Sequence, residues 1–425
     1  MQAETAPNML RWAHLPECKT PPEGWSVEYF TDIASVIAGQ SPPSETYNEK
    51  GDGLPFLQGN GDFSFKNPVA CLWCSAPVKT AREGDTLISV RAPVGEVNRA
   101  DREYAIGRGL AAVRAVGSDP DFLYHALQRW RWCLQRVAQG TTFDAVTARH
   151  FGQLWVALPR EVPEQTAIAC ILDAVDTALE RTRAAVKRVR ELRRALMQEL
   201  LPPWIGLREL TGSQKPAGVE EIVRADVVTD VCNGSTPSRI EGRYWRQGTI
   251  PWLPTGKVHD RIITVADQFV TEVALRECSI RLLPRGTVLV GMIGQGRTRG
   301  MSAYLNIEAC INQNFGAFTP RLVPTLLVWG KWLFYFLDFH YSRVREVGGG
   351  TNQGALNCHL LKRLRLPLPS LDRKKEVAAI LDGVESLEKA RLTALTLWGD
   401  LKKSLMHDLL SGRVRVRNEA KAAAS

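Results

Sequence analysis

The sequence lacks an apolar run long enough to cross a bilayer, and its N-terminus lacks the basic-then-apolar layout of a secretory signal. Nine cysteines, an odd number, are scattered singly along the chain, which favours reduced thiols over a disulfide framework. We therefore expect a cytoplasmic protein with no membrane contact. The single CxxC motif, Cys71 to Cys74, has no second ligand pair nearby, so a half-buried strand is a better interpretation than a zinc site.

Recognisable catalytic motifs are missing as well. The seven histidines form no HExxH, and the glycines between Gly294 and Gly300 fit neither GxGxxG nor a GxxxxGK loop. The stretch LPPW (201–204) resembles the Asn/Asp-Pro-Pro-aromatic motif of DNA aminomethyltransferases, but Leu201 cannot accept a hydrogen bond from the substrate amine. We therefore find no assembled active site and expect no catalytic residues, metal or cofactor. A triad whose members lie far apart in the sequence stays an open alternative at this point.

What the sequence does have is length and positive charge. Its 425 residues are enough for two to three domains, and a hydrophobic content of 44% is ordinary for a soluble globular protein. The 54 Lys and Arg residues outnumber the 45 Asp and Glu residues, which gives a formal charge of +9. This balance favours a polyanionic partner without proving one.

One long segment occurs twice and organises the chain. Residues 168–201 and 377–410 align without a gap, because ILD (171–173) matches ILD (380–382) and LM (196–197) matches LM (405–406) at one constant offset. The first copy has the four-and-three apolar spacing of a coiled-coil seam, interrupted by Thr182 and Arg193. The apolar members of this seam are Ile168, Leu172, Val175, Leu179, Val186, Val189, Leu196 and Leu200.

Each segment predicts a helix of about 34 residues, roughly 50 Å long. An isolated amphipathic helix needs a partner to cover its apolar stripe, and the other copy is the expected partner. A homodimeric coiled coil between chains is the alternative.

The repetition extends to the rest of the chain. Five further matches keep the same order in both halves while their offset increases, as expected when loops lengthen in one copy of a duplicated unit. They pair GQSPPS (39–44) with GSTPS (234–238), LPFL (54–57) with IPWL (250–253), EGDTLIS (83–89) with RGTVLVG (285–291), IGRGLAAV (106–113) with INQNFGAF (311–318), and GT (140–141) with GT (350–351).

Local patterns predict the elements inside each copy. Runs of β-branched or aromatic residues bounded by Gly and Pro predict strands at 86–90, 110–113, 287–292 and 315–318, and amphipathic runs predict helices at 122–137 and 326–347. The expected fold class is α+β, with two similar mixed α/β domains, an antiparallel two-helix coiled-coil spacer and an internal pseudo-twofold repeat. The expected segments are an N-terminal extension (1–23), a first domain (24–159), a first spacer helix (160–203), a linker (204–222), a second domain (223–369), a second spacer helix (370–412) and a flexible tail (413–425).

In this order, and twice over, the motifs resemble the DNA-specificity subunit of Type I restriction-modification systems. The resemblance covers nearly the whole chain, from about residue 25 to about residue 412. It rests on GQSPPSETYNEKGDGLPFLQGNGDF (39–63), EGDTLISVRAPVGEVN (83–98), AIGRGLAAVRA (105–115), GSTPSRIEGRYWRQGTIPWLPTG (234–256) and the two LMxxLL helix ends.

The resemblance implies two target-recognition domains, each of which reads one half of a split, asymmetric target in double-stranded DNA, and a spacer that sets the unread gap. It also implies a non-catalytic subunit that joins two methyltransferase (modification) subunits and motor-nuclease (restriction) subunits. The alternatives are a divergent DNA methyltransferase or nuclease, and a non-specific coiled-coil scaffold.

Base reading requires hydrogen-bond donors and acceptors on strand edges or loops, with Arg suited to guanine and Asn or Gln to adenine. Residues of these types occur in turns beside the predicted strands, and for each the competing interpretation is a solvated loop or a backbone cap. The candidate DNA-binding residues are Gln58, Asn60, Arg91 and Arg108 in the first copy, and Thr255, Lys257, Gln295, Arg297, Arg299, Asn312, Gln313 and Asn314 in the second. Further candidates for phosphate or partner contact are the loops at 140–142 and 348–353 and the basic helical run at 181–194.

Overall fold

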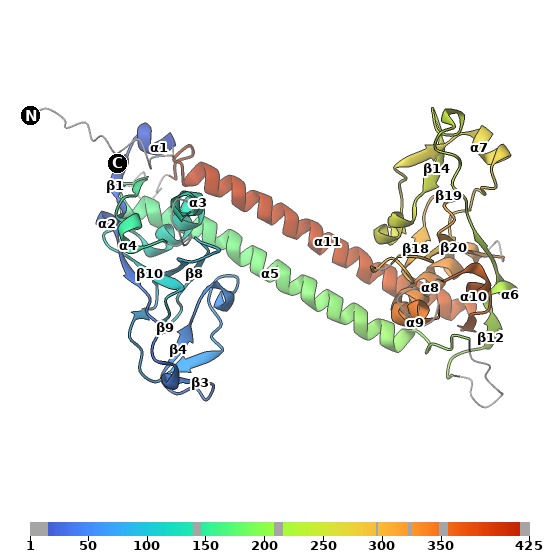
Figure 1. Cartoon of the computed structure of the whole chain (residues 1–425), viewed down its shortest axis with the longest axis horizontal. Coiled ribbons are helices and arrows are strands. Elements are labelled where there is room, and N and C mark those ends of the chain that lie inside the picture. Colours follow the sequence, from blue (N-terminus) through green and yellow to red (C-terminus); the bar gives the residue numbers. More distant parts are fainter. Residues whose placement is uncertain are drawn as a thin grey trace, which may run out of the picture. The chain divides into compact units, whose positions relative to one another are not determined.

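The computed structural model describes residues 16–138, 146–207, 216–294, 296–321, 325–347 and 356–416. The chain divides into two compact units, the first made of Met1–Ala185 with Arg391–Ser425 and the second of Val186–Ala390. Each unit contains one globular domain and parts of both long helices, and each is described by itself (Figure 1).

The first domain contains eleven strands among its described residues. They are β1 (Trp25–Tyr29), β2 (Ala34–Ala38), β3 (Tyr47–Asn48), β4 (Leu54–Leu57), β5 (Leu72–Cys74), β6 (Thr80–Ala81), β7 (Thr86–Ser89), β8 (Val97–Arg99), β9 (Tyr104–Ile106), β10 (Leu110–Ala115) and β11 (Trp155–Pro159). They form a β1-β11 pair, a four-stranded sheet in the order β2-β10-β7-β8, and a five-stranded sheet in the order β3-β5-β4-β9-β6. The helical segments are α1 (Pro16–Lys19), α2 (Phe30–Ile33), η2 (Ser44–Thr46), η3 (Asn60–Asp62), α3 (Pro120–Ala138), α4 (Ala148–Phe151) and the long α5 (Val162–Leu200).

The second domain has ten strands in its described residues. They are β12 (Glu221–Arg224), β13 (Thr229–Asn233), β14 (Ile250–Leu253), β15 (Ile262–Ile263), β16 (Gln268–Val270), β17 (Val288–Gly291), β18 (Ser302–Leu305), β19 (Cys310–Ile311), β20 (Phe315–Pro320) and β21 (Arg365–Leu368). They form a β12-β21 pair, a five-stranded sheet in the order β13-β20-β17-β18-β15, and a three-stranded sheet in the order β16-β14-β19. The helical segments are α6 (Ala225–Val228), η5 (Gly242–Tyr244), η6 (Thr255–Asp260), α7 (Glu272–Glu277), α8 (Leu326–Phe339), α9 (Tyr341–Glu346), α10 (Cys358–Lys362) and the long α11 (Leu371–Leu409).

In each domain one sheet is built around a central strand that is buried along its whole length. β7 lies between β10 and β8, β17 lies between β20 and β18, and every residue of both strands is buried. A helix packs against the sheet in each case, α3 in the first domain and α8 in the second. Most residues of α8 are buried, as expected for a helix whose sequence is apolar nearly all round.

The two domains also share strand pairings at the aligned motifs. β4 pairs in parallel with β9, with Phe56 opposite Ala105, and β14 pairs in parallel with β19, with Trp252 opposite Cys310. The antiparallel order β2-β10-β7 has its counterpart in β13-β20-β17. Two mixed-sheet domains with an internal repeat, together with long helices that pack against each other, confirm the predicted fold class.

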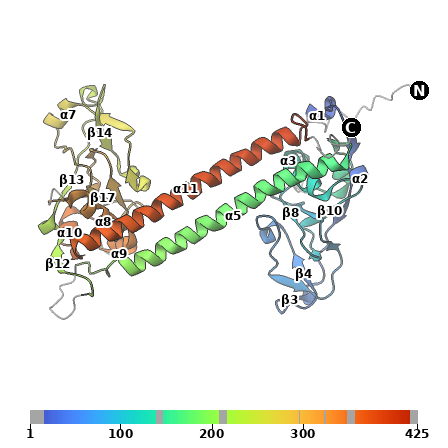
Figure 2. The ribbon, with the colours of Figure 1, turned by 180° about the vertical axis from the view of Figure 1, so that it is seen from behind.

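The long helices pair antiparallel within each unit (Figure 2). In the first unit Lys402 Nζ on α11 lies 2.7 Å from Asp176 Oδ1 on α5, and in the second unit Arg190 Nε on α5 lies 2.7 Å from Glu388 Oε1 on α11. From the first ion pair to the second, α5 advances by as many residues as α11 goes back. This is the pattern of two antiparallel helices in a constant register. Each helix has 39 residues, so each is longer than predicted, about 58 Å at 1.5 Å per residue.

One local feature differs from the sequence-based expectation. The predicted helix at 326–347 is divided into α8 and α9 at His340, whose Nε2 lies 2.9 Å from the Pro202 carbonyl oxygen. Arg415, in the segment predicted to be a flexible tail, donates two 2.7 Å hydrogen bonds to the Glu164 carboxylate of the first unit. In the part of the chain that the structure describes, no helix is both long and apolar enough to span a membrane.

Candidate nucleic-acid interface

In the first domain, the loops that follow β4, β7 and β9 are joined through their backbones. Gly107 N donates to the Leu57 carbonyl oxygen at 2.8 Å, and Val90 N donates to the Gly109 carbonyl oxygen at 3.0 Å. These bonds connect segments that are up to about fifty residues apart in the sequence. We call this set of three loops the loop frame of the first domain.

The second domain builds the same loop frame after β14, β17 and β19. Asn312 N donates to the Leu253 carbonyl oxygen at 3.1 Å, and Met292 N donates to the Asn314 carbonyl oxygen at 2.8 Å. All four residues stand at positions that the repeated motifs align with those of the first domain. The duplication therefore preserves a backbone geometry as well as strand order.

A repeated glycine allows a fourth loop to join each frame. A Cβ atom at Gly39, directly after β2, would collide with the Gly107 carbonyl oxygen, and a Cβ atom at Gly234, directly after β13, would collide with the Ile311 carbonyl oxygen. The close approach of two backbones explains why glycine occurs at this position in both copies.

The frame of the first domain carries three exposed polar candidates, Gln58, Arg91 and Arg108. Asn60 is half-buried at the start of η3, next to them. Asp62 Oδ2 accepts a hydrogen bond from Gln58 N at 2.7 Å, which fixes the turn that presents the Gln58 side chain. The structure thus brings the four candidates of this copy into one group of connected loops.

In the second domain the candidates fall into two kinds. Gln313 is exposed at the position aligned with Arg108, and its Oε1 accepts a hydrogen bond from Thr236 Oγ1 at 2.6 Å. Asn312 is only 8% exposed and exchanges hydrogen bonds of 2.8 and 3.0 Å with Thr255. Asn314, which is half-buried, donates its backbone N–H to Asn312 Oδ1 at 3.2 Å. Asn312 and Thr255 therefore support the frame, while Gln313 is presented by it.

The remaining candidates lie beside this frame. Lys257 Nζ is 2.6 Å from Asp260 and 3.1 Å from Asp267, and the hydrogen bond to Asp260 contributes most to raising the pKa of Lys257. Two carboxylates thus compensate this ammonium charge. Arg297 is exposed and Arg299 half-buried in the loop after β17. Gln295 and the loops at 140–142 and 348–353 lie outside the described residues.

A buried polar cluster holds the first domain on the helix pair, and we call it the first anchor. His125 on α3 is fully buried, and its Nε2 lies 2.9 Å from Asp173 Oδ1 on α5. Lys402 on α11 donates to Gln128 Oε1 on α3 and to Asp176 Oδ2 on α5, both at 2.9 Å. Three helices therefore meet at this cluster. Burial lowers the pKa of His125 despite its carboxylate neighbours, which favours the neutral imidazole.

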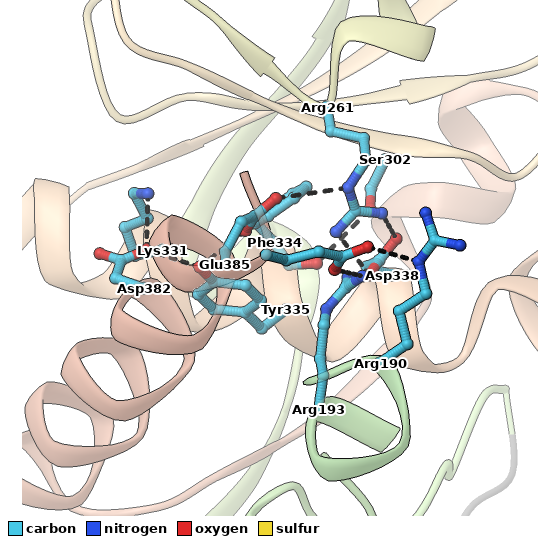
Figure 3. A network of polar contacts seen from close by, with 11 residues as sticks. Arg190, Arg193, Arg261, Ser302, Lys331, Phe334, Tyr335, Asp338, Asp382 and Glu385 are labelled. Carbon is cyan, nitrogen blue, oxygen red and sulfur yellow. Dashed lines mark hydrogen bonds and ion pairs between the residues drawn. The ribbon is translucent and has the colours of Figure 1, made fainter. Parts of the chain in front are cut away.

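The second unit has a corresponding cluster, the second anchor (Figure 3). Tyr335 on α8 lies with its hydroxyl 2.5 Å from Asp382 Oδ1 and 3.0 Å from Glu385 Oε2, both on α11. Arg193 on α5 donates to Asp338 Oδ2 on α8 at 2.8 Å. Burial and the two carboxylates raise the pKa of Tyr335, so its hydroxyl stays protonated.

The two anchors use aligned positions with different chemistry. The aligned pairs are His125 with Tyr335, Gln128 with Asp338, Asp173 with Asp382, Asp176 with Glu385, and Lys402 with Arg193. The sequence analysis did not single out these residues as a cluster. Two signals pointed to them: the ILD motif in both helices, and the interruption of the apolar seam at Arg193.

The LPPW stretch, which the sequence analysis weighed as a methyltransferase motif, and a His/Asp cluster found in the structure both have structural roles here. Leu201 of the LPPW stretch is buried in the core of the second unit, and the Pro202 carbonyl oxygen pairs with His340. His125, Asp173 and Asp176 bring their ligand atoms within 4.8 Å of one another. However, Arg99 lies 3.3 Å from Asp173 and Lys402 lies 2.7 Å from Asp176, so these cations already compensate the carboxylates.

The repeated loop frames and the paired helices define a protein with two similar domains, each of which contacts both long helices. Residues 22–188 and 221–397 match the family described as type I restriction modification DNA specificity domain. The chain belongs to this family, and it is accordingly a specificity subunit of a restriction enzyme complex and not one of its catalytic subunits.

Two curated relatives from Methanocaldococcus jannaschii illustrate the range of similarity. The MjaX specificity subunit is 36% identical over 188 residues, which is 42% of this chain and 43% of that protein, so the match covers less than half of the relative. The type I restriction enzyme MjaVIII specificity subunit is 22% identical over 418 residues, which is 93% of this chain and 94% of that protein.

Solved structures show the same fold. The S subunit of a type I restriction-modification system from M. genitalium superposes with a TM-score of 0.63 at 15% identity, and the match covers 91% of this chain and 96% of that one. A chain from a study of complex assembly and conformational transition of the type I R-M system gives a TM-score of 0.53 at 19% identity, covering 92% and 99%.

Proposed function

We propose that the chain binds DNA sequence-specifically and reads a bipartite, asymmetric target. The observation that supports this most strongly is the loop frame, which has the same backbone hydrogen bonds in both domains but presents different side chains. Arg108 stands in the first frame where Gln313 stands in the second, and both are exposed. Arg suits guanine and Gln suits adenine in the major groove, so one geometry used twice would read two different half-sites.

The candidate contacts divide into base-reading and supporting residues under this proposal. Exposed side chains on or beside the frames contact base edges or phosphates; they are Gln58, Arg91, Arg108, Arg297 and Gln313, with Asn60, Asn314 and Arg299 as neighbours. Gln295 stays a candidate from the sequence alone. Asn312, Thr255 and Lys257 hold the frame in shape, because their polar groups are already engaged within the protein. The net charge of +9 favours association with the phosphate backbone.

The helix pair acts as a ruler that sets the unread gap between the half-sites. A continuous helix of 39 residues is about 58 Å long, enough to support readers that lie one helical turn of DNA apart, about 34 Å. Four residues added to both helices would move the readers by about 6 Å. The gap should therefore change while both half-sites stay the same.

Catalysis belongs to partner subunits in this proposal. The chain joins two methyltransferase subunits and motor-nuclease subunits in the cytoplasm, and those partners bring the S-adenosylmethionine, ATP and magnesium chemistry to the DNA. Membership of the specificity family supports this arrangement.

A binding selection with the purified full chain and a random DNA pool tests the proposal. We expect two short fixed blocks of sequence separated by a constant gap. Four residues are then inserted after Ala185 in α5 and after Thr393 in α11, positions that oppose each other in the antiparallel register set by the ion pairs. A new gap with unchanged blocks supports the ruler, and changed blocks at the old gap refute it. Methyl transfer or cleavage by the chain alone would favour an enzyme, and the lack of any preferred sequence would favour a scaffold.

A further inference from the structure

We propose that Lys402 and Arg193 are positioning residues for gap recognition, and this rests on the proposed function. Each residue fixes one recognition domain on the helix pair, so that the chain accepts one gap length between the half-sites. Neither residue is placed to read bases, because both are engaged in the anchors.

In each anchor, the cation lies on the long helix that follows the opposite domain in the sequence. α5 follows the first domain, but its Arg193 contacts Asp338 on α8 of the second domain. α11 follows the second domain, but its Lys402 contacts Gln128 on α3 of the first domain. Each domain is therefore attached to its own helix through His125 or Tyr335, and to the other helix through the cation. Two attachments on two helices resist a rotation that a single attachment would permit.

The cations are shielded enough for these contacts to be directional. The side chain of Lys402 is 17% exposed and that of its partner Asp176 is 3% exposed. Arg193 is 20% exposed and its partner Asp338 is 16% exposed. Charge-assisted hydrogen bonds in such surroundings are stronger and less screened by salt than those on an open surface.

The position of the cations in the helices favours a role beyond helix pairing. Arg193 interrupts the apolar seam of α5, and Lys402 occupies the aligned position of α11. A charged residue in a seam lowers the stability of the helix pair, and its known benefit is to specify one arrangement. This loss of stability occurs twice in the chain. In both cases the charged group contacts a helix of a globular domain, since Arg193 contacts α8 and Lys402 contacts α3.

Gap discrimination depends on how firmly each domain is held. One base pair changes the separation of two half-sites by about 3.4 Å and their relative rotation by about 34°. A firmly held domain cannot follow such a change without losing contacts, whereas a loosened domain can. Loosening an anchor should thus broaden the accepted gaps without altering what each domain reads.

The test compares anchor variants of the full chain with matched neighbours. Arg193→Met is the main variant, because Asp338 keeps two hydrogen bonds from Arg261 and is not left unpaired. Lys402→Met combined with Asp176→Asn tests the other anchor without leaving a buried carboxylate charge. The controls are Arg194→Met and Lys403→Met, which remove a cation from an exposed position of the same helices. Arg193→Lys serves as the rescue variant, since it keeps the charge.

Binding is measured on DNA that carries the selected half-sites with the gap varied one base pair at a time. We expect the preference for the best gap over its neighbours to fall about tenfold in both anchor variants, which corresponds to about 1.4 kcal/mol. The preference for each half-site over single-base changes should stay as in the unmodified chain, and Arg193→Lys should recover most of the gap preference. An unchanged gap preference, or an equal loss of both preferences, overturns the proposal.

A measurement without DNA separates this proposal from the proposed function. Spin labels are introduced as non-natural amino acids at the exposed positions Ile240 in the second domain and Leu387 on α11. The distribution of distances between them should broaden in Arg193→Met and not in Arg194→Met. An unchanged width overturns the positioning role, whereas the lack of any selected sequence for the unmodified chain overturns the proposed function.

Discussion

The hydroxyl of Tyr335 gives a direct measure of what the second anchor contributes to stability. Replacing Tyr335 by Phe keeps the fully buried ring and removes only the hydroxyl, which lies 2.5 Å from Asp382 and 3.0 Å from Glu385. Neither carboxylate loses its cation, because Lys331 remains 2.8 Å from Asp382 and Arg261 remains 3.5 Å from Glu385. The hydroxyl has one proton to donate, so the loss is one hydrogen bond to a charged acceptor, about 1.5–3 kcal/mol.

Urea unfolding followed by tryptophan fluorescence is a suitable assay, because Trp329 and Trp332 are buried in the core that contains Tyr335. With a slope of about 1–3 kcal/mol per molar urea, the midpoint of the transition should fall by roughly 1 M. Tyr29→Phe is the control, since Tyr29 is 42% exposed, and we expect a change within about 0.5 kcal/mol. A loss below about 0.5 kcal/mol for Tyr335→Phe would refute the reasoning that the hydroxyl bridges α8 and α11.

Three further predictions concern pH, helix packing and base preference. Burial lowers the pKa of His125 below the ordinary 6.5, so the unfolded chain binds a proton that the folded chain does not. Stability should therefore fall as the pH decreases below about 6.5, and His125→Gln should remove that part of the decrease in urea titrations. Gly399→Ala should stabilise α11 by about 0.5–1 kcal/mol in thermal unfolding, because nothing lies near the added Cβ, whereas Gly330→Ala should destabilise α8, because its Cβ would collide with a backbone carbonyl oxygen. In a binding selection, Arg108→Ala should relax one position of one half-site by about 1–3 kcal/mol and leave the other half-site unchanged; an equal loss at both would contradict separate readers.

Most of what could be predicted about the fold from the sequence follows from the internal repeat. An ungapped match of the long segments, with an apolar seam, was enough to predict two helices that pack against each other. The strand predicted at 110–113 is Leu110–Ala115 in the structure, and the one predicted at 287–292 is Val288–Gly291. Local patterns mark such elements well because they depend on burial of one face or of a whole strand.

The local sequence pattern did not predict that the helix at 326–347 is divided at His340. At the break His340 Nε2 lies 2.9 Å from the carbonyl oxygen of Pro202, a residue that is distant in the sequence. The same limit applies to the candidate site. The role of Lys257 depends on Asp267, and that of Asn312 on Thr255, so residue type and turn position could not separate supporting residues from presented ones.

The comparison of the two copies explains how one fold can serve two recognition tasks. The bonds that both loop frames share are made by backbone atoms, so Arg108 in one copy and the aligned Gln313 in the other present different groups while these shared bonds stay the same. The anchors follow a different rule. Their side chains make the contacts themselves, and His125 with Gln128 in one copy is matched by Tyr335 with Asp338 in the other, each set complementary to its own partners on the helices. Under the proposed function, target sequence is therefore free to change at the frames, while a change at an anchor requires a compensating change on α5 or α11.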